Sequence, residues 1–146
     1  MNISSWVRRI FIGIAVMAVL YVAACTYMWA TQLDHVFEPD TVLQTTPDRL
    51  GMKFEEVRIP VGSGSEQGEL YVWWIPSDVA GAPTMLYFHG NYRNISNNLE
   101  HTQRLHNLGY NVLRADYRGF GRSSGGKPNE MKVYEDAEAE IGRAHV

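Results

Sequence analysis

The feature that most constrains this chain is an uncharged run of about twenty residues near its N-terminus. Between Ile10 and Ala30 there is no Asp, Glu, Lys or Arg, and most side chains are aliphatic or aromatic. A helix needs about 20 such residues to cross the hydrocarbon core of a bilayer, and there it satisfies its own backbone hydrogen bonds. The run therefore predicts a transmembrane helix over residues 10–30.

The charges on the two sides of this run predict its orientation. Arg8 and Arg9 precede it, whereas the first Lys or Arg after it is Arg49. Four acidic residues lie in between: Asp34, Glu38, Asp40 and Asp48. Because basic residues stay on the cytoplasmic side, we expect residues 1–9 in the cytoplasm and the rest of the chain outside it, with a bacterial inner membrane as the setting.

Two other interpretations of the apolar run stay open. A cleaved signal peptide has a shorter apolar core, of about 7–15 residues, and a small-residue cleavage site. The string Val22-Ala23-Ala24-Cys25 resembles a lipoprotein box, which would place a lipid on Cys25. The apolar run continues past this cysteine, so we favour Cys25 as a small apolar residue of the helix. As the only cysteine, it excludes an internal disulfide and a CxxC motif.

Composition and residue spacing exclude several functions. The net charge is −3 and no broad basic surface is predicted, so we expect no nucleic-acid partner. The histidines show no HExxH or His-x-x-x-His spacing, so we expect no metal site and no cofactor. They are His35, His89, His101, His106 and His145.

Residues 31–52 predict a connector, and period-2 patterns begin after it. Val57 and Ile59 alternate with charged residues up to Pro60, which predicts a half-buried strand. A second alternating stretch covers residues 69–75, after a turn rich in Gly and Ser. These two strands are expected to form an antiparallel hairpin.

The next segment has the pattern of a βαβ unit. Residues 85–88 form a continuous apolar run, which predicts a strand buried on both faces. Leucines at helical spacing over residues 96–108 predict a helix that stops at Gly109, and residues 111–115 predict another strand. The two strands should be parallel, because a crossover helix joins them.

The last predicted element is a helix over residues 131–144. A glycine-rich loop precedes it, and Val133, Ala137 and Ile141 are spaced by four along one side, which predicts its buried face. No apolar strand follows it, so we expect the sheet to lack its next member. The fold class is α/β, with an antiparallel hairpin and then a parallel βαβ unit, preceded by a transmembrane helix.

Three motifs of the chain resemble the N-terminal half of α/β-hydrolases. They are Leu86-Tyr87-Phe88-His89-Gly90-Asn91, Asp116-Tyr117-Arg118-Gly119-Phe120-Gly121, and Tyr134-Glu135-Asp136-Ala137. The preceding apolar run narrows the likeness to the single-pass membrane group related to the serine aminopeptidase-like hydrolases. The resemblance implies a truncated α/β-hydrolase domain at residues 53–146, and a serine hydrolase that cleaves esters, thioesters or amides through an acyl-serine.

The resemblance also implies roles for the loop after the 85–88 strand. In such hydrolases this loop gives one backbone N–H to the oxyanion hole. The donor here would be the amide of Asn91, with Tyr92 as the second choice. His89 and Gly90 would shape the loop, and His89 would not be the catalytic base.

One motif match is interpreted as a decoy. Gly121-Arg122-Ser123-Ser124-Gly125 fits the GxSxG pattern, but a nucleophile elbow needs a strand directly before it and a helix directly after the serine. Here five residues separate the strand from the motif, and two glycines and Pro128 follow the serine within five residues. We therefore predict that Ser123 is a loop residue and that the nucleophile, acid and catalytic histidine are absent.

These observations lead to three hypotheses. In the first, the complete protein is a membrane-anchored serine hydrolase acting on a small-molecule or peptide acyl substrate near the bilayer. The 146-residue chain would then be an inactive fragment from a truncated or frameshifted reading frame. In the second, the protein is a non-catalytic, membrane-tethered binding or scaffold protein with the same fold. In the third, the N-terminal helix with its connector is the only stable part, because unpaired strand edges favour aggregation.

Overall fold

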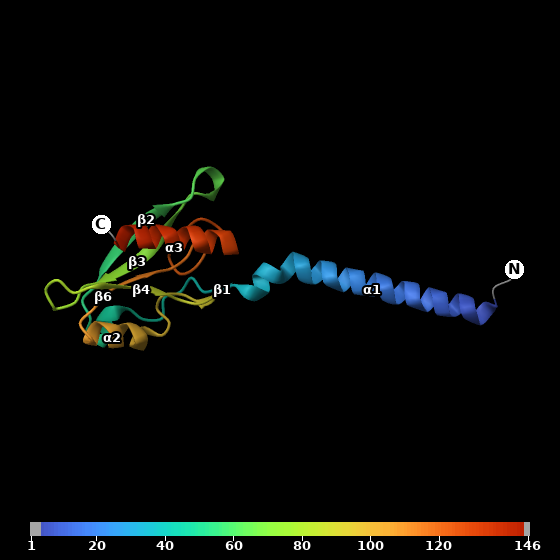
Figure 1. Ribbon diagram of the computed structural model, residues 1–146, viewed down its shortest axis with the longest axis horizontal. Helices are drawn as coiled ribbons and strands as arrows, with labels where there is room; N and C mark the ends of the chain where they lie inside the picture. Colours follow the sequence, from blue (N-terminus) through green and yellow to red (C-terminus); the bar gives the residue numbers. More distant parts are fainter. Residues whose placement is uncertain (1–3, 145–146) are drawn as a thin grey trace. The chain divides into compact units, whose positions relative to one another are not determined.

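The computed structural model describes residues 4–144, which form two compact units that meet between Val36 and Phe37. The first unit is helix α1 (Ser5–Val36), the blue ribbon in Figure 1. Its mean hydropathy is 2.3 and none of its side chains is buried. By length and composition it could cross a membrane, and an N-terminal signal sequence would have the same properties.

Helix α1 continues beyond the uncharged run at both ends. Residues 31–36 contain neither Gly nor Pro, so nothing in this polar stretch interrupts the helix. The hydroxyl of Thr31 donates to the carbonyl of Tyr27, four residues earlier. Pro39 follows soon after the helix, and it disfavours helical backbone at the residue before it.

The second unit is built on a four-stranded sheet with the order β2-β3-β6-β4. Strands β2 (Glu55–Val61) and β3 (Gly68–Ile75) form the predicted antiparallel hairpin, whose turn contains the 3-10 helix η2 (Gly64–Glu66). Strands β4 (Thr84–Phe88) and β6 (Asn111–Ala115) are parallel, joined through helix α2 (Leu99–Asn107). The predicted hairpin and βαβ unit are both confirmed.

The two helices of the second unit pack on opposite faces of this sheet, as Figure 1 shows. Helix α2 covers one face, where Tyr71, Trp73 and Val112 are fully buried. Helix α3 (Glu130–Ala144) covers the other face, where Leu70 and Val72 belong to a second apolar cluster. Side chains alternate along each strand, so one sheet supplies both clusters.

Strand β4 differs from its prediction. Met85 is 37% exposed and Phe88 is 41% exposed, so this strand is not buried on both faces. Within residues 4–144, β4 pairs with β6 alone and therefore lies at an edge of the sheet. The apolar run was interpreted as a strand buried on both faces, but the run alone does not show what covers each face of the strand.

The buried side of α3 also differs from its prediction. Lys132, Asp136 and Glu140 are buried, whereas Ile141 of the predicted apolar row is 41% exposed. The helix is turned by about one residue because the carboxylate of Asp136 binds a buried arginine, Arg118. A specific ion pair has overridden the apolar periodicity.

The segment after α1 folds into the second unit. Strand β1 (Glu38–Pro39) pairs in parallel with β5 (Tyr92–Arg93) in a separate two-stranded sheet. The 3-10 helix η1 (Pro47–Leu50) follows, and Leu43 and Leu50 pack against the core. Residues 31–52, which were predicted to be a connector, are thus shared between α1 and the second unit.

Candidate active site

The candidate site lies where the parallel strands β4 and β6 end. Phe88 is paired with Ala115, so the next residue of each strand, His89 and Asp116, comes to the same edge of the sheet. Open α/β sheets bind their ligands at the carboxyl ends of parallel strands. The motif residues His89, Gly90 and Asn91 therefore stand at the edge where chemistry is expected.

A cavity of about 190 Å³ opens at this edge. It is lined by Phe37, His89, Gly90, Asn91, Tyr117, Phe120 and Val133. The ring centroid of His89 lies 4.8 Å from that of Tyr117 and 5.2 Å from that of Phe120. Typical ligand pockets measure about 300–1,000 Å³, so this volume corresponds to part of one.

The hydroxyl of Tyr117 stays neutral at ordinary pH. Burial raises its pKa to about 12, and the nearby carboxylates of Glu140 and Asp136 act in the same direction. A phenol with this pKa cannot serve as a general base near pH 7. Tyr117 therefore contributes an aromatic wall to the cavity and no proton-accepting group.

The loop after β4 is held on one side by β1. The carbonyls of Asn91 and Arg93 accept hydrogen bonds from the amides of Glu38 and Asp40, at 2.9 and 3.1 Å. Along an extended strand the polar groups of successive residues point in alternate directions, so the amide of the intervening Tyr92 is directed away from β1.

The first residues of this loop leave room beside the backbone. A Cβ atom built on Gly90 would meet no atom within 4 Å. Gly90 therefore does not relieve crowding inside the protein, and the space next to it is open. A substrate group could approach the backbone of the loop at this position.

The side chain of Asn94 fixes the far part of the loop. Its Nδ2 donates to the carbonyls of Asp40 and Val42, at 2.9 and 2.8 Å. Its Oδ1 accepts hydrogen bonds from the amide and the hydroxyl of Ser96. Asn94 is buried, and sequence reasoning did not identify it because it lies outside the three motifs.

Asp116 joins the two ends of the loop, and sequence reasoning did not identify it as a site residue. Its carboxylate is fully buried, and Oδ1 accepts a 2.7 Å hydrogen bond from the amide of Ile95. The same oxygen lies 3.4 Å from Nε2 of His89. The strand pairing could have revealed it, because Asp116 follows β6 just as His89 follows β4.

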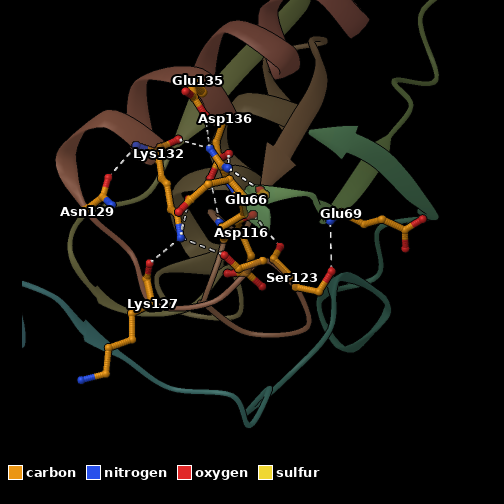
Figure 2. Close-up of polar contacts among 12 residues, drawn as sticks. Glu66, Glu69, Asp116, Ser123, Lys127, Asn129, Lys132, Glu135 and Asp136 are labelled. Carbon is orange, nitrogen blue, oxygen red and sulfur yellow. Dashed lines mark hydrogen bonds and ion pairs between the residues drawn. The ribbon is translucent and has the colours of Figure 1, made fainter. Parts of the chain in front are cut away.

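The hydroxyl of Ser123 is used within the fold. It donates to the carbonyl of Asp116 at 2.6 Å and accepts from the amide of Tyr71 at 2.8 Å. The next residue, Ser124, accepts from the amide of Glu69, so both serines attach the loop to β3 (Figure 2). Neither a strand directly before Ser123 nor a helix directly after it is present.

Arg118 attaches this glycine-rich loop to helix α3. Its Nε and its backbone amide each donate to the Asp136 carboxylate at 2.7 Å, and its Nη2 contacts Glu135. Lys132 donates to two loop carbonyls and forms an ion pair with Glu66, which Figure 2 shows beside the loop. The hydrogen bond from Lys132 to the Glu66 carboxylate lowers the pKa of Glu66. The network positions the loop.

No group of three or more metal-ligating side chains occurs among residues 4–144. The other histidines that the structure describes in the second unit have partners of their own: His101 stacks on Tyr87, and His106 bonds the carbonyl of Pro76. His145 lies outside the described residues.

We compared the chain with known proteins and found similar sequences. No protein-family model matches it. It is 32% identical over 98 residues to the alpha/beta hydrolase domain-containing protein WAV2 of Arabidopsis thaliana, over 66% of this chain and 30% of that protein. An uncharacterized Mycobacterium tuberculosis protein is 28% identical over 127 residues, over 86% of this chain and 44% of that protein.

A solved structure has a similar fold. The Pyrococcus furiosus esterase Pf2001 superposes with a TM-score of 0.62 and 27% identity, over 74% of this chain and 40% of the esterase. The chain thus spans less than half the length of each of these three proteins.

Proposed function

We propose that this chain, which belongs to the α/β-hydrolase superfamily, supplies the N-terminal part of a membrane-anchored serine hydrolase. The hydrolase class rests on its relatives and on its likeness to an esterase. The reaction of the whole protein would be hydrolysis of an ester, thioester or amide, on a small-molecule or peptide acyl substrate. The observation that carries the proposal is the exposed loop at the carboxyl end of β4.

The oxyanion donors would be the backbone amides of Asn91 and Tyr92. The direction of the Tyr92 amide, away from β1, supports it as a donor, and the open space beside Gly90 supports access to the loop. One such donor contributes about 3–4 kcal/mol to the transition state. By the same alternation the amide of Asn91 is directed toward the side of β1, so the geometry supports Tyr92 more strongly than Asn91 as the donor.

In the proposed reaction a serine Oγ attacks the acyl carbon, and the carbonyl electrons move to the oxygen beside this loop. The tetrahedral intermediate collapses, the alcohol, thiol or amine leaves with a proton from a histidine, and water releases the acid from the acyl-serine. We propose that this serine, its histidine and the acid are not among the 146 residues. The two hydrogen bonds of Ser123 support this part of the proposal.

His89 is proposed to shape the loop and not to act as the base. Its Nδ1 lies 2.7 Å from the carbonyl oxygen of Gly90 and therefore donates to it. Its Nε2 faces the carboxylate of Asp116. Both ring nitrogens are thus directed at groups of the loop's own framework, and neither is directed at a nucleophile.

Helix α1 is proposed to cross the membrane, with residues 1–9 in the cytoplasm and the second unit outside it. Its length of 32 residues corresponds to about 48 Å, more than the roughly 30 Å of a hydrocarbon core. Arg8 and Arg9 before the apolar run support this orientation. Labelling of Cys25→Ser variants that carry a new cysteine at Ser4 or Asp78, with a membrane-impermeant maleimide, tests it: only Asp78→Cys should react from outside.

A fluorophosphonate probe tests the chemistry. The 146-residue chain should not be labelled, and the protein encoded by the whole reading frame should be labelled at a serine beyond Val146. Ser123→Ala is the matched control, and it should leave labelling of the whole protein unchanged. Labelling of Ser123 in the 146-residue chain would overturn the assignment. A whole protein that neither reacts with the probe nor cleaves esters would instead be a binding or scaffold protein.

A further inference from the structure

We infer that Asp116 is the positioning residue of the candidate oxyanion loop, defined as residues 89–95. That the loop forms an oxyanion hole rests on the proposed function, whereas the contacts of Asp116 with the loop are observed in the structure. A single oxygen, Oδ1 of Asp116, lies 2.7 Å from the Ile95 amide nitrogen and 3.4 Å from His89 Nε2. One carboxylate therefore bonds the amide of the last residue of the loop and lies against the imidazole of the first.

The hydrogen bond to Ile95 is of the stronger kind. A backbone N–H that donates to an ionised carboxylate makes a shorter and roughly twofold stronger bond than one between neutral groups. Its donor and acceptor are both buried, so water does not compete for either. This bond fixes the end of the loop to the sheet.

Asp116 itself is fixed by its own backbone. Its amide donates to the carbonyl of Tyr71 on β3 at 2.9 Å, and its carbonyl accepts from Ser123 at 2.6 Å. It directly follows β6, which lies between β3 and β4 in the sheet. The carboxylate is thus held by the end of an inner strand of the sheet, and its hydrogen bond positions the loop relative to that strand.

Gly121 packs directly against the carboxylate of Asp116 and restricts its position. A Cβ atom added at Gly121 would overlap Oδ2 of Asp116, so the backbone of Gly121 lies directly against this oxygen. Gly121 has a φ of +49°, a conformation that glycine adopts without strain. The glycine-rich loop therefore packs against one oxygen of the carboxylate, while the other oxygen bonds Ile95 at the end of residues 89–95.

A buried carboxylate is costly unless its environment compensates for the lost water. Oδ2 of Asp116 has no hydrogen-bond partner among residues 4–144, so the compensation here comes through Oδ1 alone. Such an expensive group is retained where it has a positional role. The two amides proposed for the oxyanion hole lie on the segment between its two contacts, and such donors must be held within about 0.5 Å to be effective.

The experiment is ¹⁵N NMR spectroscopy of the detergent-solubilised 146-residue chain, which needs no catalytic activity. Its readouts are the amide proton shift and hydrogen-exchange rate of Ile95 and the amide shifts of Asn91 and Tyr92. Asp116→Ala removes the hydrogen bond to Ile95 and should move the Ile95 proton upfield, speed its exchange by about tenfold, as expected for one lost hydrogen bond, and shift the Asn91 and Tyr92 amide signals. Asp116→Asn keeps an acceptor for Ile95 and should restore most of its shift.

The control is Asp136→Asn, which perturbs another buried carboxylate attached to the same glycine-rich loop but makes no contact with residues 89–95. It should leave the Ile95 signal in place. If Asp116→Ala does not fold, Asp116→Asn still has to shift the signals of His89 or its neighbours, because the charge facing Nε2 is lost. The inference is wrong if either folded Asp116 variant leaves all loop signals unchanged, or if Asp136→Asn changes them equally.

Failure of the proposed function would give a different result. In that case the NMR changes would appear as described, while the whole protein would lack esterase activity with or without Asp116. If both proposals hold, Asp116→Asn in the whole protein should lower kcat by about tenfold or more with a smaller change in KM, because the loop acts on the transition state.

Discussion

Glu140 gives the sharpest test of the packing of helix α3. Its side chain is 1% exposed, it lies on the face of α3 that covers the second apolar cluster, and its Oε1 has no hydrogen-bond partner among residues 4–144. Burial raises the pKa of Glu140 from 4.5 to about 8, although the charge of Arg114 acts in the opposite direction. At neutral pH the folded chain should therefore carry this carboxyl group protonated.

The sign of the effect follows from the two pKa values. The unfolded chain releases the proton near pH 4.5 and the folded chain only near pH 8, so the folded state binds more protons between these values. The contribution of Glu140 to stability should thus be most favourable below pH 4.5 and should fall as the pH rises toward 8. At pH 7 the difference of about 2.5 pH units corresponds to about 3 kcal/mol.

The substitution Glu140→Gln removes the titration and keeps the shape of the side chain. We expect the free energy of unfolding of Glu140→Gln, relative to the natural chain, to rise by about 3 kcal/mol between pH 4.5 and pH 7. Urea unfolding in mild detergent measures it. Trp6→Phe and Trp29→Phe in all samples leave the tryptophan fluorescence to β3 alone.

The matched control is Glu138→Gln, which removes the same charge from an exposed position of the same helix. Its effect should stay within about 0.5 kcal/mol at every pH, as for most surface substitutions. A stability difference for Glu140→Gln that is the same at pH 4.5, 7 and 9 would refute the reasoning, because Glu140 would then titrate as it does in water.

Three further substitutions test the polar framework of the candidate site. Asp136→Ala should lower the free energy of unfolding by about 3–5 kcal/mol in urea titrations, because it leaves the buried guanidinium of Arg118 without its carboxylate. Gly121→Ala should cost about 1–3 kcal/mol in the same assay, and less in an Asp116→Ala background, where the overlap with the carboxylate is gone. Ser123→Ala should cost about 1–2 kcal/mol of stability through its two lost hydrogen bonds, while fluorophosphonate labelling of the whole protein stays at the natural level.

The fold could be predicted where it depends on local patterns. Alternation at Val57 and Ile59 and the two short apolar runs predicted the hairpin and the parallel pair, because strand periodicity depends only on neighbours in sequence. The exposure of β4 could not be predicted in this way. An apolar run indicates burial in general, and only the sheet order decides how many neighbours a strand has.

Helix α3 shows where apolar periodicity fails. Its spacing favoured Val133, Ala137 and Ile141 as the buried row, but an arginine from the preceding loop binds Asp136 and turns the helix. The motif residues Arg118 and Asp136 were both visible in the sequence. Their pairing was not, because nothing local relates a loop residue to a helix residue 18 positions later.

The candidate site could also be predicted only in part from the sequence. His89 and Gly90 could be placed at the end of a strand from sequence, and the roles of Asn91 and Tyr92 remain proposals. Asp116 escaped notice because an acidic residue after a strand is common, and its value depends on the parallel register that brings it opposite His89. A correct topology would have been enough to find it.

Three buried carboxylic acids of this domain, Asp116, Asp136 and Glu140, differ in their hydrogen-bond partners. Asp116 follows strand β6 and Asp136 lies on helix α3, and each has a hydrogen-bonded partner that fixes a loop. Glu140 is buried on the helix that covers an apolar cluster, and no described side chain or amide compensates its Oε1. If burial alone governed these groups, all three would cost similar amounts of stability. Because burial raises the pKa of Glu140 while an arginine pairs with Asp136, replacement of Glu140 by Gln should stabilise the fold at pH 7, whereas Asp136→Ala should destabilise it.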